Sequence, residues 1–217
     1  MRILFFDTET NGLPRHSYAP ITDLENWPRV LQIAWQLWDL SGGEFTNLVT
    51  ACHMIKPNPE MLWNAGSAVI HKISRERAIA EGVPGTIAFR EFKAVLDQAH
   101  VVVAHNISFD KPVIIAECLR LQTDKDYSWW KQIEFCTCLD TRAICKIPAL
   151  NPKANDPYKR PKLIELYTFL HESAPAFNFH SADGDTECLL SCFQKLLERR
   201  LVPIDDWTRR LRVLGLL

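Results

Sequence analysis

The chain has 217 residues, of which 47% are hydrophobic and 24% are charged, and its formal net charge is −1. These values are typical of a globular protein with one sizeable α/β core, and they argue against a protein that binds a long duplex through a basic surface. No apolar run approaches the roughly 18–20 residues that a membrane span needs.

Three strands are expected first along the chain. Residues 2–6 form a continuous apolar run that ends at Asp7, which is typical of a central strand. Residues 15–29 are polar and contain prolines, so we interpret them as a loop. Residues 30–40 and 45–55 are expected to be two further strands, joined by a glycine-containing turn.

Helices and strands are then expected to alternate. A short helix begins at Ser74 and ends before Gly82, and the later helices are expected at 86–98, 110–121, 162–171 and 183–199. Residues 100–104 read as a buried strand, whereas 122–134 and 146–160 are polar and are expected to be loops. The pattern predicts a mixed sheet with helices on both faces, in one domain over residues 1–200. Residues 201–217 form a tail that can contain one more short helix.

The cysteines and the first residues bear on the compartment. The seven cysteines contain no C-x-x-C pair, so they predict free thiols in a reducing compartment rather than a structural zinc site. The first residues combine one arginine with a short apolar run, which is typical of a strand and not of a secretory signal. We therefore expect a cytoplasmic protein.

Acidic side chains from three separate segments are the most informative feature. Asp7 and Glu9 lie two residues apart on an extended segment, so their side chains share a face and can reach one metal ion. A surface strand can show this spacing without any function, but here a buried apolar strand leads directly into the pair.

Two further acids complete the candidate site. Asp110 stands at the expected start of a helix, where an aspartate can also serve only as an N-cap. Asp185 lies in the first turn of a later helix, after His180, and Asp183 is its nearest competitor. Converging carboxylates repel each other unless cations are bound, and hard oxygen ligands favour Mg²⁺ or Mn²⁺ over zinc or copper.

Three motifs together resemble the histidine subtype of the DEDD superfamily of 3′→5′ exonucleases, which includes proofreading epsilon-type exonucleases, RNase T and oligoribonuclease. The motifs, in order over residues 4–190, are Asp7-x-Glu9, His105-Asn106-x-x-Phe109-Asp110 and His180-x-Ala182-x-x-Asp185. The resemblance implies an α/β, ribonuclease H-like fold with a mixed five-stranded sheet and helices on both faces. It also implies hydrolysis of single-stranded or frayed 3′ ends, with DNA favoured, to nucleoside 5′-monophosphates.

The resemblance implies a role for each of the five residues. Asp7, Glu9, Asp110 and Asp185 would hold two Mg²⁺ or Mn²⁺ ions, with Asp7 bridging the ions and Asp110 acting mainly as an outer partner. His180 would be the general base that deprotonates the attacking water, as an imidazole can do near neutral pH. Two such ions stabilise the attacking and the leaving oxygen of an in-line displacement.

Further positions are implied to contact the substrate: Thr10, Asn11, Gly12, Leu13, His71, Asn106 and Phe109. An ordinary turn also explains Asn11, and Phe109 also suits the core. The basic cluster Lys159, Arg160 and Lys162 is either a solvated loop or a phosphate contact. Trp129 and Trp130 either anchor their loop or stack on bases.

Other functions stay open. An exoribonuclease that trims RNA would differ in how its pocket treats one 2′-hydroxyl, and no residue type reveals that. A non-catalytic nucleic-acid-binding module would be expected to lack an acid or the histidine, but all five are present. A partner of a DNA polymerase, or of another replication or repair protein, is the third alternative. The long segments 15–29 and 122–160 are expected to border the cleft.

Overall fold

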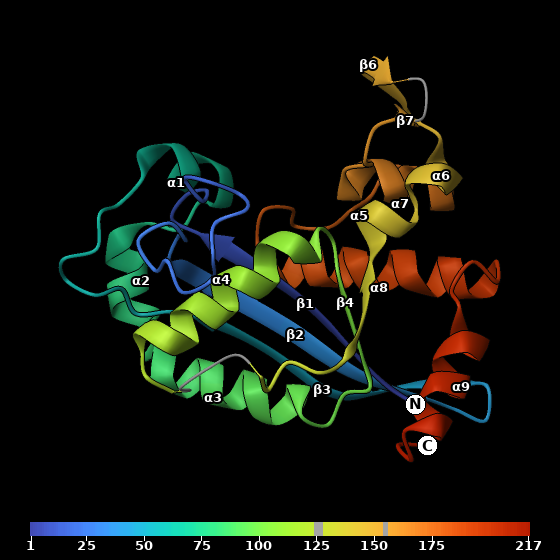
Figure 1. The fold of residues 1–217 in the computed structure, drawn as a ribbon. Coiled ribbons are helices and arrows are strands. Elements are labelled where there is room, and N and C mark those ends of the chain that lie inside the picture. The colour runs from blue at the N-terminus through green and yellow to red at the C-terminus, as the bar shows by residue number, and fades with distance from the viewer. Residues whose placement is uncertain (124–127, 154–155) are drawn as a thin grey trace.

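A mixed five-stranded sheet forms the centre of the protein (Figure 1). The computed structural model describes residues 1–123, 128–153 and 156–217. The strands, in the spatial order β3-β2-β1-β4-β5, are β1 (Arg2–Thr10), β2 (Val30–Ser41), β3 (Glu44–Met54), β4 (Val101–Ala104) and β5 (Ile133–Cys136). The first three pair antiparallel, whereas β4 is parallel to both β1 and β5. The predicted mixed sheet is therefore confirmed.

Helices cover both faces of this sheet, as predicted. They are α1 (Ala65–His71), α2 (Arg75–Glu81), α3 (Gly85–Leu96), α4 (Ile107–Arg120), α5 (Thr137–Asp140), α6 (Arg142–Cys145), α7 (Leu163–His171), α8 (Ala182–Glu198) and α9 (Ile204–Val213). Figure 1 shows α3 and α4 on one side of the sheet and α8 on the other. Among the described residues, no helix is long and apolar enough to cross a membrane.

The alternation of side chains along β1 produces two separate cores. Leu4 and Phe6 point to the face under α3 and α4, while Ile3 and Phe5 point to the face under α7, α8 and α9. Aromatic rings fill both layers, and Phe5 meets Phe193 of α8 edge-on at 5.0 Å between ring centroids. The central strand is thus held from both sides, which gives its carboxyl end a fixed position.

Several expected boundaries were wrong. The first strand does not end at Asp7 but continues to Thr10, because it keeps pairing with β2. The helix expected at 110–121 begins at Ile107, so Asp110 is inside its first turn and Asn106 is the N-cap.

Some elements were missed altogether. Helix α1, strand β5 and the short helices α5 and α6 were not predicted. Of the loop expected at 122–134, residues 124–127 lie outside the described residues, and its end is the start of β5. Trp130 does anchor this region, since it is buried against Phe6 and Phe92. Each of the seven cysteines keeps its thiol and none forms a disulfide, as predicted.

The segment 146–160 is not simply a loop. It contains β6 (Pro148–Lys153) and β7 (Asp156–Tyr158), which pair antiparallel outside the main sheet. Residues 154–155 lie outside the described residues. Figure 1 shows this hairpin projecting beyond α5, α6 and α7, away from the body of the molecule. Prolines and asparagines hid its pairing, because a two-stranded ribbon with no buried face shows no apolar alternation.

Candidate functional site

Three of the predicted carboxylates meet at the end of the central strand. Asp7, Glu9 and Asp185 each offer an oxygen, and these three oxygens lie within 4.8 Å of one another. All three side chains are half-buried, so an ion among them would be reached from solvent and still be largely enclosed. Such a set of hard, anionic oxygen ligands fits a divalent cation.

The local structure explains why these acids converge. Asp7 and Glu9 are next-but-one neighbours on β1 and therefore share its face. The pairing with β2 shifts register between Glu9 and Thr10, which ends the regular ladder just beyond the pair. Asp185 lies in the first turn of α8, whose N-cap Ser181 accepts a hydrogen bond from the Gly184 N–H.

Asp110 lies beside this trio but faces differently. It is 3% exposed, and its Oδ1 accepts a 2.6 Å hydrogen bond from the Thr8 hydroxyl. Its charge contributes to raising the pKa of Asp7, so the two carboxyls are close. The structure thus groups all four acids, with Asp110 as the member already engaged by a neighbouring side chain.

The electrostatics of the group are those of a site that lacks compensating charge. Burial, followed by the charges of Asp110, Asp185 and Glu9, raises the pKa of Asp7 well above its ordinary value. Burial and the charges of Asp185 and Asp110 raise the pKa of Glu9 to about 8. Burial raises the pKa of Asp110 to about 7 and that of Asp185 to about 6. A divalent cation would replace the protons that these groups otherwise take up.

His180 stands at the solvent side of the group. Its backbone is in the left-handed region, with φ 63°, and its N–H donates to Asp185 Oδ2 at 3.1 Å. The side chain is exposed and lines a cavity of about 350 Å³ together with Asp7 and Asp185. Gly184 permits this arrangement, because a Cβ there would lie 2.2 Å from the Asn178 carbonyl oxygen. The need for glycine at position 184 was not predicted from the sequence.

Two cavities flank the carboxylates. The first, cavity A, is the one just described, and Lys162 also lines it. The second, cavity B, has about 480 Å³ and is lined by Glu9, Gly12, Leu13, His71 and Phe109, among others. Asp7 and Asp185 belong to cavity A and Glu9 to cavity B, so the carboxylates stand where the two meet. Each volume is in the range of small-ligand pockets.

Thr10 and Asn11, at the end of β1, use their side chains for hydrogen bonds within the protein. The Thr10 hydroxyl donates to the Gly12 carbonyl at 2.7 Å. Asn11 Oδ1 accepts from the Arg29 N–H at 2.7 Å and its Nδ2 donates to the Leu62 carbonyl at 3.2 Å. Only Leu13 is free to meet a ligand with its whole side chain, since it is 81% exposed.

His71, Phe109 and Asn106 were the remaining predicted contacts. His71 Nδ1 accepts from the Ile73 N–H at 3.0 Å, so the hydrogen is on Nε2, which is buried and has no partner among the described residues. Phe109 lines cavity B and also packs on the core. Asn106 is not among the described residues that line cavities A and B, and its Oδ1 accepts from the Ser108 hydroxyl.

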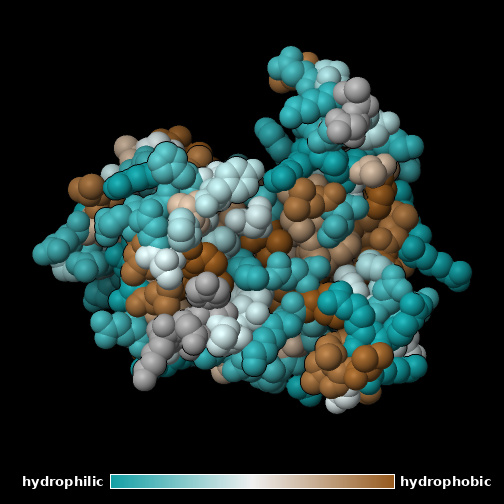
Figure 2. Space-filling view, in the orientation of Figure 1, coloured by the Kyte–Doolittle hydropathy of each residue, from teal (hydrophilic) through white to brown (hydrophobic). Residues whose placement is uncertain are grey.

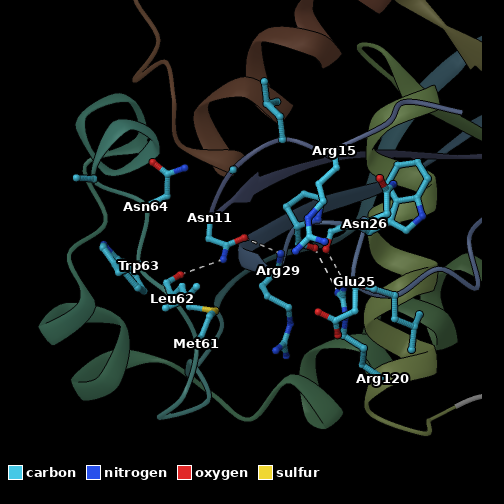
Figure 3. Close-up of a pocket in the computed structure, with 16 residues that line it drawn as sticks. Asn11, Arg15, Glu25, Asn26, Arg29, Met61, Leu62, Trp63, Asn64 and Arg120 are labelled. Carbon is cyan, nitrogen blue, oxygen red and sulfur yellow. Dashed lines mark hydrogen bonds between the residues drawn. The ribbon is translucent and has the colours of Figure 1, made fainter. Parts of the chain in front are cut away.

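The predicted loop 15–29 borders a third cavity, of about 960 Å³, which shares Gly12, Leu13 and Asn64 with cavity B. Figure 3 shows Asn11 bridging Arg29 and Leu62 on its wall. Arg120 of α4 donates to the carbonyl oxygens of three loop residues, Leu24, Trp27 and Pro28. The loop is therefore a fixed wall beside the site.

Sequence analysis also missed two contributors. His105 was noted only as part of a motif, but its Nε2 donates to the Pro161 carbonyl at 3.0 Å and its Nδ1 lies 2.9 Å from the Thr137 hydroxyl. Burial lowers the pKa of His105 to about 4, so it is a neutral cross-link. Gln32 Oε1 accepts from the Ala182 N–H at 2.9 Å and ties β2 to the start of α8. Neither role has a local sequence signal, because both join distant segments.

Comparison with known proteins identifies similar folds but no similar sequences. No family model matches the chain, and no curated protein matches it in sequence. Similar folds occur in Escherichia coli exonuclease I: a complex with a dT13 oligonucleotide (TM-score 0.71, 18% identity, 97% of this chain) and the zinc-ion-bound form of its single-stranded DNA complex (TM-score 0.69, 20% identity, 97% of this chain). A third exonuclease I structure, described as suggesting how processivity is achieved, has a TM-score of 0.69 at 20% identity over 92% of this chain.

These likenesses establish the fold. The predicted ribonuclease H-like, mixed five-stranded α/β architecture is confirmed. The chain spans less than half the length of the exonuclease I chains, namely 44%, 43% and 42% of them.

Proposed function

We propose that this protein is a divalent-metal-dependent 3′→5′ exonuclease of the DEDD type that acts on single-stranded or frayed 3′ ends and releases nucleoside 5′-monophosphates. The observation that carries the proposal is the meeting of three carboxylate oxygens within 4.8 Å at the junction of two cavities. The exonuclease I fold, seen with single-stranded DNA in the matched proteins, supports the same conclusion and favours DNA.

The metal requirement follows from the donor set. Asp7, Glu9 and Asp185 would hold the cation. Asp110, whose charge acts on Asp7, would be an outer partner. A pair of bound Mg²⁺ or Mn²⁺ ions would supply the positive charge that the attacking and leaving oxygens need. Zn²⁺ is also included in the degradation assay, because one matched structure is described as zinc-bound.

The protein's own residues would position and activate the reactants. His180, exposed in cavity A, would take a proton from the water as its oxygen bonds to phosphorus. The bond from phosphorus to the 3′-oxygen of the penultimate nucleotide breaks, and that oxygen receives a proton from solvent. Leu13 and Phe109 would hold the terminal nucleoside in cavity B, where the unpartnered Nε2–H of His71 can donate to it.

The remaining sequence-based alternatives have less support. A binding module without catalysis would not need four grouped carboxylates with an adjacent imidazole, because their repulsion costs stability. RNA is an alternative substrate that the same site would accept, and it is tested directly. A DNA polymerase partner stays a prediction from the sequence resemblance, since the matched structures are described with DNA oligonucleotides.

A degradation assay tests the proposal. The substrates are 5′-labelled single-stranded DNA, duplex DNA with a mismatched 3′ end and short RNA, each with Mg²⁺, Mn²⁺, Zn²⁺ or EDTA. We expect a ladder of 3′ shortening with Mg²⁺ or Mn²⁺, none with EDTA, and none from Asp7→Ala. Asp183→Asn is the control. Asp183 is exposed in the first turn of α8, beside Asp185, and this variant should keep its activity. Digestion by Asp7→Ala at the parent rate would show that the site is misassigned.

A further inference from the structure

The β6–β7 hairpin and the residues that connect it to α6 and α7 are not part of the carboxylate group. We define the basic arm as residues 146–153 and 156–162. Figure 1 shows it standing beyond α5 and α7, and Figure 2 shows that its described surface is mainly hydrophilic. The hairpin is outside the central sheet and buries no strand face, so core packing does not explain why it is there.

The arm carries a concentration of positive charge. Between residues 146 and 162 the chain has five basic side chains and one acidic side chain, which gives a net charge of +4, whereas the whole chain carries −1. The remaining residues are therefore acidic on balance. A local excess of this size in an otherwise acidic protein is the electrostatic footprint of a polyanion partner.

Internal pairing uses only part of this charge. Arg142 of α6 pairs with Asp156, the first residue of β7, at 2.8 Å, and Lys159, just after β7, pairs with Glu165 at 2.5 Å. The other basic residues of the arm form no ion pair within the described part of the chain and are exposed: Lys146, Lys153, Arg160 and Lys162. These four side chains are therefore accessible to a partner.

The arm is connected to the candidate site. The Pro161 carbonyl accepts from His105 Nε2, and His105 directly follows β4 beside Asn106. The next residue, Lys162, lines cavity A together with Asp7 and His180. Positive charge thus begins at the wall of the cavity and continues outward along the arm.

We propose that the basic arm is a docking surface for the phosphate backbone of a single strand whose 3′ end is in the candidate site. The inference rests on the proposed function and adds a binding surface for nucleotides upstream of the bond that is cut. The arm would hold phosphates without reading bases, so it would raise affinity for long strands of any sequence. A dinucleotide in the site would meet the arm only at Lys162, which lines cavity A and is left unchanged in the test.

The test compares three proteins: the parent, a variant with Lys146→Ala, Lys153→Ala and Arg160→Ala, and a control with Arg90→Ala, Arg209→Ala and Arg212→Ala. The control residues are exposed on α3 and α9, away from the arm (Figure 1). Each protein is given thymidine dinucleotide and an oligothymidylate of roughly 20 nucleotides with Mg²⁺ or Mn²⁺. Fluorescence anisotropy in EDTA measures binding of the same long strand without any reaction.

For the arm variant we expect a KM about tenfold higher on the long strand, and weaker binding in EDTA by a similar factor. For this variant the slope of log affinity against log salt concentration should become less steep by about 2, because each of the three lost phosphate contacts contributes about 0.7 to the slope. Dinucleotide cleavage should match the parent, and the control should match the parent in every assay. Thermal unfolding checks that the three proteins are equally folded.

The two proposals can fail separately. If the arm variant and the control bind and digest the long strand equally, the docking surface is wrong although the nuclease stands. If no protein cleaves either substrate but the arm variant alone loses binding in EDTA, the arm is supported and the proposed activity is wrong. Conservative Lys146→Arg and Lys153→Arg substitutions should keep parent-like binding, since the charge is kept.

Discussion

The backbone N–H of His180 donates a hydrogen bond to Oδ2 of Asp185 at 3.1 Å. The bond joins the candidate base to a candidate metal ligand and holds His180 in its left-handed conformation. Because the donor is a backbone group, substitution of the imidazole leaves the bond intact. The chemical role of the side chain can therefore be tested apart from its local structure.

His180→Asn should lower kcat by about 10²–10⁴ and change KM little, because a general base is lost while the substrate surfaces remain. Asparagine tolerates left-handed backbone better than most residues, so the fold should be kept. Steady-state kinetics on single-stranded DNA measures the effect, and thermal unfolding provides the control. A kcat equal to that of the parent would mean that another group takes the proton.

The carboxylate group should make the metal-free protein less stable as pH rises. The pKa of Glu9 is raised from 4.5 to about 8 in the folded state, so its contribution to stability is full below about 4.5 and is lost as pH rises through 8. Glu9→Gln removes this dependence and should be more stable than the parent at pH 9 in EDTA, with little difference at pH 5. Urea unfolding at both pH values measures this.

Saturating Mg²⁺ or Mn²⁺ should narrow the difference in stability between Glu9→Gln and the parent at pH 9. Binding at a concentration of about 100 times Kd stabilises the folded parent by about 2.7 kcal/mol, and Glu9→Gln should gain less because it has lost a ligand. An equal gain for both proteins would contradict the assignment of Glu9 to the cation site.

Much of this site follows from local sequence rules. Asp7 and Glu9 share a face because side chains on a strand repeat every two residues, and Asp185 falls in a first helical turn marked by Ser181. The bonds that fix the site did not follow. Asn11 joins Arg29 to Leu62, and His105 reaches Pro161, so each partner is set by the tertiary fold. Helix α1 was missed although Asn64 is a good N-cap, because the residues that follow it include Gly66 and Ser67, which have weak helix propensity.

Asn11→Ala should act through structure rather than through substrate contact. It removes an acceptor for the Arg29 N–H and a donor to Leu62, so we expect a loss of about 1–3 kcal/mol in unfolding free energy together with a raised KM. Leu13→Ala is the matched variant, because Leu13 is exposed beside it and should raise KM without loss of stability. Chemical denaturation and kinetics on both variants separate the roles; a fully stable Asn11→Ala would contradict the bracing role.

Glu117 should be essential for the wall formed by residues 15–29. It is 1% exposed and pairs with both Arg29 and Arg120, while Arg120 also donates to loop carbonyls. Glu117→Ala leaves two cations without their buried partner and should cost about 3–5 kcal/mol in unfolding free energy. Hydrogen exchange should show faster opening of residues 20–29, and unchanged exchange there would rule out this network as the support of the loop.

Calorimetric titration of Mn²⁺ at pH 8 into the parent and into Asp7→Ala is the most direct test of the central claim that Asp7, Glu9 and Asp185 form a divalent-cation site. We predict saturable uptake by the parent, with release of protons from Glu9, whose pKa of about 8 leaves it partly protonated at this pH, and loss of uptake in Asp7→Ala. No uptake by the folded parent, or equal uptake by both proteins, would contradict it.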